Sequence, residues 1–163
     1  MKIEQFSKKE IAVRQIETAL DLFFSGSDLF SVITLAGAGE EILGKYVEAQ
    51  GEKPAVAKAA EAFKVIFHEL FKEPREINEV KWSVLNNARN EIKHMKVKEG
   101  KLDPQDEIVN LDPHDSAVHM LTRAIENYYG LTGLLSENMQ RFLKEEYSKP
   151  PWPSSRHHGI ERS

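Results

Sequence analysis

The sequence predicts an all-α protein, a bundle of four or five helices in up-down order. Glycine and proline are sparse, with nine and seven copies in 163 residues, and they cluster at a few positions. The segments between those positions are too long for strands, and their apolar residues recur with the 3.6-residue period of a helix. We expect one bundle domain over residues 1–148, which is long enough for a sizeable core, and a flexible, proline-rich and polar tail over residues 149–163.

Breaks in the pattern delimit the first three helices. The first is expected over residues 8–24, because Ser25-Gly26-Ser27 interrupts the apolar period. Ser27 or Asp28 is the expected N-cap of the second helix, which runs to about residue 50. The third begins near Pro54, since proline is tolerated in the first turn of a helix.

A polar stretch over residues 96–111 divides the rest of the chain. The fourth helix is expected before it, over residues 77–95. Asp112 and Pro113 follow it and have the pattern of an N-cap and a first-turn proline. They predict a fifth helix that extends to Tyr147, with Gly130 and Gly133 as bend points.

Composition narrows the chemistry and the compartment. With 26 acidic and 22 basic side chains the net charge is −4, which argues against a protein that coats DNA by broad phosphate neutralisation. The absence of cysteine excludes disulfides, thiolate nucleophiles and cysteine-ligated zinc. The sequence shows neither a signal peptide nor an apolar run of about 20 residues, so we expect a cytoplasmic protein without membrane contact.

One carboxylate stands on the apolar stripe of the second helix. Glu40 falls between core-facing positions, whereas Glu41 points to the polar side. A carboxylate that faces a core needs a partner. The small residues of Ala36-Gly37-Ala38-Gly39 allow a neighbouring helix to approach, and we expect the fourth helix to provide the partner. Two interpretations stay open: a glutamate satisfied structurally by that helix, or an acid that supports an active site.

The fourth helix carries a polar stripe of Asn86, Asn90 and His94 at i, i+4 spacing, with Asn87 beside it and Arg89 at its flank. Asparagine is a poor helix former, so this concentration costs local stability without adding to the core. Residues that break a local rule in this way are expected at functional sites. A solvated helix face with side-chain caps is the structural alternative.

These residues also carry a family resemblance. The string Arg89-Asn90-Glu91-Ile92-Lys93-His94 resembles the Arg-x4-6-His signature of the HEPN superfamily, and LAGAGEEILGKYVE resembles its alanine-rich, glutamate-bearing second helix. The resemblance covers roughly residues 8–147 and implies an HEPN-like bundle. It also implies a metal-independent endoribonuclease without a cofactor. The implied catalytic residues are Arg89, Asn90 and His94, supported by Glu40, Asn86 and Asn87.

The residue types suit cleavage of RNA by its own 2′-hydroxyl. A histidine serves as base or acid at neutral pH, and arginine offers a charged fork to phosphate oxygens. One motif has one histidine, whereas the reaction has two proton transfers, so two copies of Arg89 and His94 are expected to meet in the cleft of a homodimer. RNA or a nucleotide is the expected ligand. A toxin or defence role with a nucleotidyltransferase or other antitoxin partner is implied by the resemblance.

Local charge and helical geometry qualify this site. Residues 79–101 hold six basic and three acidic side chains, net +3, so the rest of the chain carries −7. Residues 102–115 then hold five acids and no lysine or arginine, which suits a discriminating or inhibited enzyme.

Arg89 and His94 lie roughly 140° apart on a straight helix, so we expect His94 where the last turn loosens.

Other interpretations remain open. A non-catalytic HEPN-like module that binds RNA, a nucleotide or a protein partner fits the same residues. Glu91 and His94 also form a Glu-x-x-His unit, which binds metal in ferritin-like bundles, although the sequence lacks a second such unit. Arg123 on the fifth helix fits either a phosphate-binding role or a surface ion pair.

Overall fold

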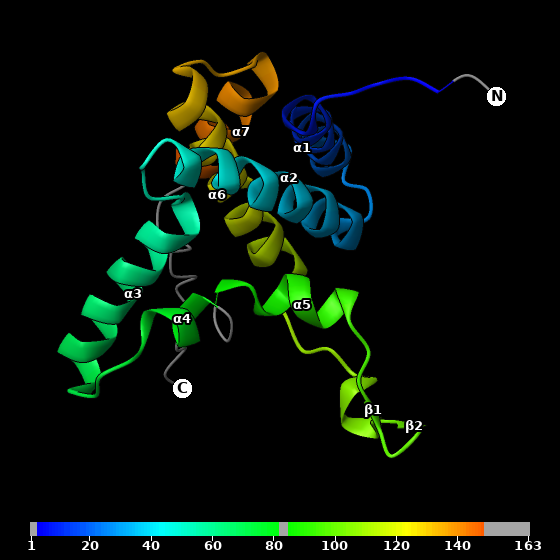
Figure 1. Ribbon diagram of the computed structural model, residues 1–163, viewed down its shortest axis with the longest axis vertical. Coiled ribbons are helices and arrows are strands. Elements are labelled where there is room, and N and C mark those ends of the chain that lie inside the picture. The colour runs from blue at the N-terminus through cyan, green and yellow to red at the C-terminus, as the bar shows by residue number, and fades with distance from the viewer. Residues whose placement is uncertain (1–2, 82–84, 149–163) are drawn as a thin grey trace, which may run out of the picture.

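The all-α bundle is confirmed. The computed structural model describes residues 3–81 and 85–148, and four helices form its packed body: α1 (Lys8–Phe24), α2 (Leu29–Ala49), α6 (Pro113–Thr132) and α7 (Glu137–Tyr147) (Figure 1). Every buried side chain of the apolar core cluster comes from these four helices. Ile16, Ile33, Leu121 and Phe142 are among its largest fully buried members.

Side-chain caps fix where the body helices begin. Asp28 accepts hydrogen bonds from the backbone N–H groups of Phe30 and Ser31 at the start of α2, as the sequence predicts. Asp112 accepts the N–H of Asp115 at 3.0 Å and so caps α6, whose first residue is a proline. Both caps satisfy backbone donors that have no partner within the helix.

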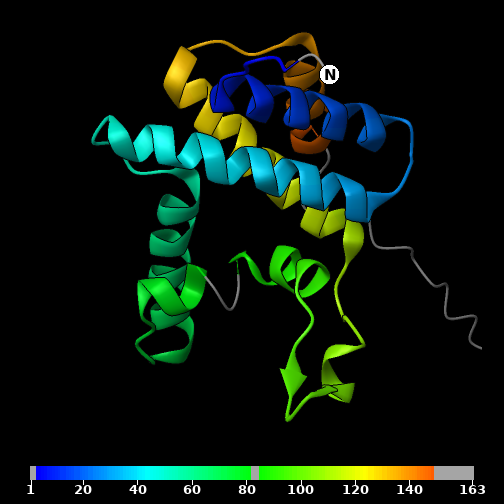
Figure 2. The same cartoon turned by 45° about the vertical axis from the view of Figure 1, so that its right-hand side comes forward.

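Three further helices extend from one side of this body: α3 (Ala55–Phe71), α4 (Ile77–Val80) and α5 (Asn87–Lys93) (Figure 2). The buried residues of α3 are all alanines near its start, whereas Ile66 and Leu70 are exposed. The predicted start of α3 at Pro54 is confirmed.

Polar contacts fasten the start of α3 to the body. Asn127 on α6 accepts the backbone N–H of Ala55 at 2.8 Å and donates to the backbone carbonyl of Glu40 at 3.1 Å. Its side chain is 2% exposed. One buried amide therefore joins α2, α3 and α6.

The prediction of one continuous fourth helix is wrong. The segment forms α4, which ends at Val80, and α5, which begins after Asn86. Asn86 has φ −106° and ψ 2°, and its buried side chain accepts a hydrogen bond from Arg123. The apolar period that predicted a single helix passes through this position, because periodicity alone does not register a polar contact with another helix.

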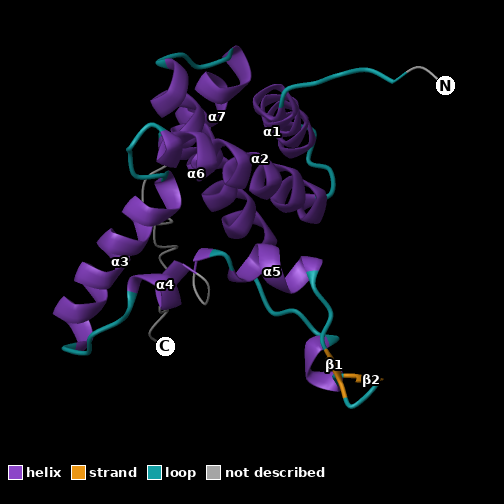
Figure 3. Cartoon of the chain, in the orientation of Figure 1, coloured by secondary structure: helices purple, strands orange, loops and turns teal. Residues whose placement is uncertain are grey.

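The predicted fifth helix is also two helices. Gly133 has φ +66°, a left-handed conformation that ends α6 after Thr132, so this glycine is a terminator rather than a bend point. The polar stretch before α6 holds a short hairpin, β1 (Val97–Lys98) with β2 (Lys101–Leu102), and a 3₁₀ turn over Pro104–Asp106 (Figure 3). This hairpin was not predicted from the sequence.

Two further predictions concern the chain ends and membranes. The flexible tail predicted for residues 149–163 lies outside the described residues. None of the helices in residues 3–81 and 85–148 has the length and hydropathy needed to cross a bilayer.

Candidate functional site

Helix α5 carries the predicted catalytic residues. Arg89 and Asn90 lie within this short helix and are partly buried. His94 is its C-cap, with φ −120° and ψ 139°, and is exposed. The helix has therefore already ended at His94, as the sequence analysis expected, and the angle calculated for a straight helix does not apply to this side chain.

The Arg89 side chain lies against α2 in a groove that Gly37 creates. A Cβ atom at Gly37 would come within 2.6 Å of Arg89 Cδ, so only glycine leaves room for the arginine stem. The guanidinium Nη1 donates to the Gly37 carbonyl at 3.3 Å and to Glu41 Oε2 at 3.1 Å. The side chain is only 11% exposed, and its position is fixed by α2.

Arg123 anchors the residues that precede α5. Its Nη1 donates to the Leu85 carbonyl at 2.8 Å, and its Nη2 donates to Asn86 Oδ1 at 3.1 Å. Arg123 is 6% exposed, so it forms neither a surface ion pair nor a solvent-exposed phosphate contact. The sequence analysis left its role open, because its position on an amphipathic helix does not show which neighbour it meets.

Glu40 faces the core as predicted and is 3% exposed. Its Oε1 lies 3.9 Å from Arg123 Nε. Burial raises the pKa of the Glu40 carboxyl, and the nearby charges of Arg123 and Arg89 oppose that rise. Burial also lowers the pKa of Arg123, and Glu40 opposes this shift. The charged partner of Glu40 is therefore Arg123 on α6, so the prediction that the fourth helix provides this partner is wrong.

The remaining candidates divide between the two sides of α5. Asn86 is buried and holds Arg123, whereas Asn87 is exposed. Arg89 faces α2 and His94 is exposed beyond the helix end, with no hydrogen bond between their side chains in the part of the chain that the structure describes. Within the described part of the single chain, Arg89 is thus held against α2, and the His94 side chain is not hydrogen-bonded to it.

A cleft of about 300 Å³ opens beside Arg89, between α2, the start of α3, and the segments of α4 and α5. Acidic and basic side chains line it in equal numbers, together with amides. The polar lining residues are Glu40, Glu41, Lys45, Glu48, Asn78, Lys81, Asn86 and Arg89. The cleft has the size of a small-ligand site and offers both donors and acceptors.

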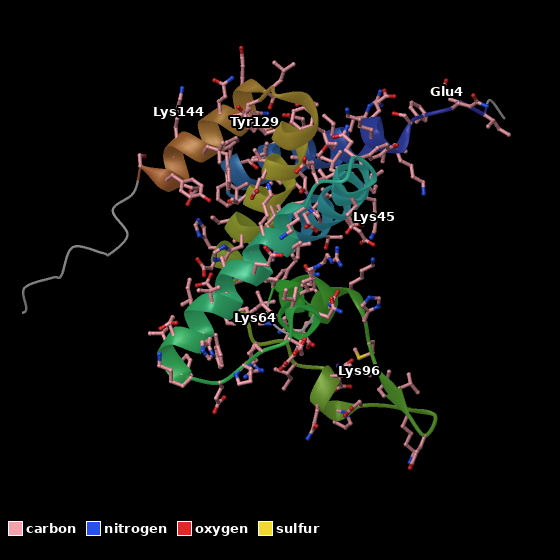
Figure 4. The ribbon with its side chains drawn as sticks, turned by 60° about the vertical axis from the view of Figure 1, so that its left-hand side comes forward. Glu4, Lys45, Lys64, Lys96, Tyr129 and Lys144 are labelled. Atoms are coloured by element: carbon pink, nitrogen blue, oxygen red, sulfur yellow. The ribbon has the colours of Figure 1, made fainter. Side chains whose placement is uncertain are left out.

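The predicted basic window is partly neutralised by the acidic stretch that follows it. Asp106 pairs with Lys96 at 2.8 Å and also accepts the Lys96 backbone N–H. In Figure 4, Lys45 lies on α2 above α5, whereas Lys96 lies below α5 beside the hairpin. The lysines that line the cleft together with Arg89 are Lys45 and Lys81, neither of which was a candidate from the sequence.

The described residues do not form the metal-ligand set that the ferritin-like interpretation requires. Within residues 3–81 and 85–148, no three His, Asp or Glu side chains gather closely enough to hold a metal ion. Glu91 and His94 thus lack the further carboxylates that a dinuclear centre requires.

Comparison with models of protein families, with curated proteins and with solved structures gives no match for this chain. The HEPN resemblance therefore remains an interpretation of the motif and of the helices that carry it.

Proposed function

We propose that the protein is an HEPN-like, metal-independent endoribonuclease that acts as a homodimer. The observation that carries the proposal is the fixed guanidinium of Arg89 at the wall of a cleft, on the same helix that ends at an exposed His94. Arginine suits the charge that develops on a phosphorane, and an exposed imidazole suits proton transfer to and from RNA oxygens.

The reaction assigns each residue a step. His94 takes the proton of the RNA 2′-hydroxyl, whose oxygen attacks the adjacent phosphorus. Arg89 stabilises the charge on the non-bridging oxygens while the bond to the 5′-oxygen breaks. His94 of the second copy donates a proton to that 5′-oxygen, leaving a 2′,3′-cyclic phosphate and a 5′-hydroxyl. We assign Asn90, which lies between the two in sequence, a hydrogen bond to the substrate.

A cleavage assay tests this proposal. Wild-type protein, Arg89→Lys, Arg89→Ala and His94→Ala are incubated with single-stranded and structured RNA, with and without EDTA. We expect EDTA-resistant cleavage that both alanine variants lose, with 2′,3′-cyclic phosphate ends on the products. His119→Ala is the matched control, because His119 is an exposed histidine like His94 but lies on α6, outside the Arg89–His94 motif.

The other outcomes separate the alternatives. Cleavage that EDTA abolishes indicates a metal-dependent enzyme and contradicts the mechanism. Binding of RNA or of a nucleotide without cleavage indicates a binding module. A protein that sediments as a monomer at micromolar concentration contradicts the shared site. A role as a toxin or in defence, with an antitoxin or nucleotidyltransferase partner, is part of the same proposal and is tested by co-purification.

A further inference from the structure

In the free protein the candidate phosphate-binding group already holds an anion. Arg89 Nη1 is 3.1 Å from the carboxylate of Glu41, one helical turn from Gly37 on α2. The pair is asymmetric: the Arg89 side chain is 11% exposed, and the Glu41 side chain is 57% exposed. A carboxylate thus occupies a position on the guanidinium that a phosphate oxygen would take.

The asymmetry allows Glu41 to leave while Arg89 stays. Arg89 keeps its second contact, the Gly37 carbonyl, and its stem remains in the groove that Gly37 opens. Glu41 is an exposed side chain, so it can rotate into solvent at little cost. An ion pair with one exposed partner adds little net stability, because water competes for it.

The neighbouring cleft has room for the displacing group. It contains about 300 Å³ and is lined by Lys45 and Lys81 as well as by Arg89. Glu48, another carboxylate of the cleft, is paired with Lys45 at 2.7 Å and not with Arg89. An anion that enters the cleft must therefore compete with the Glu41 carboxylate for Arg89 and with the Glu48 carboxylate for Lys45.

We propose that Glu41 is an autoinhibitory counter-ion of the Arg89 site, and that a phosphodiester must displace it to bind. This inference rests on the proposed function for the identity of the ligand, an RNA phosphate. Isolated phosphate competes poorly with a carboxylate on the same protein, whereas an RNA chain adds further contacts along the cleft. With Glu41 on Arg89, a ligand therefore needs more contacts with the protein in order to bind.

The test measures binding rather than cleavage. The probes are inorganic phosphate and a short 2′-O-methyl RNA, which has no attacking hydroxyl. We expect Glu41→Gln to bind both about two- to fivefold more tightly than the wild type, because the anion no longer has to displace the partly exposed Glu41 carboxylate from Arg89. The gain should disappear when Glu41→Gln is combined with Arg89→Ala.

Glu48→Gln is the matched variant, since it removes the same charge from the same cleft. Its gain should stay below about twofold, because its carboxylate is held by Lys45 rather than by Arg89. Equal gains in the two variants, or no gain in Glu41→Gln, would overturn the inference. Tighter binding by Glu41→Gln in a protein that never cleaves RNA would support the counter-ion and refute the ribonuclease. Circular dichroism verifies that the exposed substitutions leave the fold intact.

Discussion

A methyl group at position 37 would overlap Arg89, since Cδ and Cγ of the arginine lie 2.6 and 3.1 Å from where that carbon would be. We expect Gly37→Ala to lower the free energy of unfolding by about 1–2 kcal/mol. The steric overlap with Arg89 costs more than the higher helix propensity of alanine contributes. RNA cleavage should fall with it, because Arg89 must leave its groove. Urea denaturation and the cleavage assay measure the two effects.

Gly130 provides the comparison for that substitution. It lies in α6, and a Cβ there would meet nothing within 4 Å. Gly130→Ala should therefore raise the free energy of unfolding by about 0.5–1 kcal/mol, as expected for glycine in a helix interior. If both variants were stabilised, the groove around Arg89 would not be as tight as the structure shows.

Glu40 makes stability depend on pH in a defined direction. Burial raises its pKa above the ordinary value of 4.5, so the folded protein holds this proton at pH values where the unfolded chain has lost it. The Glu40 contribution to stability is fully present below pH 4.5 and is lost as pH rises through the raised pKa. We expect the unfolding free energy of the wild type, relative to Glu40→Gln, to fall as the pH rises above 4.5.

The pH dependence is measured by urea denaturation of both proteins across that range. The slope for one proton cannot exceed about 1.4 kcal/mol per pH unit. The charges that face Glu40 are those of Arg123, Arg89 and Glu41, and both proteins keep them. A relative stability that instead rises with pH would mean that attraction from the two arginines outweighs the effect of burial.

The structural roles of individual residues differ in how far they can be predicted from the sequence. Glu40 was predictable, because a carboxylate in an apolar stripe contradicts its surroundings and needs a partner. Arg123 was not, since an arginine at the edge of a helix stripe is usually solvated. Its contacts with Leu85 and Asn86 come from a segment 37–38 residues away in sequence, and only the fold brings them together.

At the scale of elements, α5 depends on polar contacts for its position. The core cluster includes no buried residue of α5, and Ile92 packs only at its margin. We expect Arg123→Lys, which keeps the charge but loses the planar fork, to release the start of this helix. Hydrogen exchange of the α5 amides should accelerate about tenfold, while that of α1 and α2 changes less.

Arg141→Lys is the appropriate control for this measurement. Arg141 lies on α7, where its exposed side chain pairs with Glu145 at 2.7 Å. The same chemical change there should leave α5 exchange unaltered. Uniform acceleration in Arg123→Lys would instead show that Arg123 stabilises the whole bundle rather than one helix.

Element boundaries were predictable where a local signal sets them. Asp28 and Asp112 cap their helices through side-chain hydrogen bonds to residues two or three positions along the chain. At Asn86 the only local signal was a poor helix former, and the contact that Asn86 makes with Arg123 of a distant helix could not be seen in the sequence. Gly133 was predicted to bend the helix, whereas its left-handed conformation ends α6, and glycine occurs in the sequence for either purpose.

At the scale of the whole molecule, the proposed reaction requires two histidines in one cleft. If they act together, a dimer with a single His94→Ala subunit is inactive. An equal mixture of wild-type and His94→Ala chains, refolded together, should retain about one quarter of the wild-type activity, the fraction of dimers with two intact copies.

Independent sites would give about one half in the same experiment. Mixing the wild type with His119→Ala should leave the activity undiminished, because His119 lies on α6, outside the Arg89–His94 motif. A value near one half would contradict the shared cleft while leaving a ribonuclease with one active site per chain.

The glycines of α2 also bear on how the molecule folds. Gly37, Gly39 and Gly44 each lie close to a different set of neighbours, on α5 and α6, on α1, and on α6 with Pro54. Each interior glycine lowers intrinsic helix stability by about 1 kcal/mol relative to alanine, so this segment is a poor helix on its own. We therefore expect α2 to gain its helical structure together with these neighbours, so that the groove for Arg89 forms only when the bundle assembles.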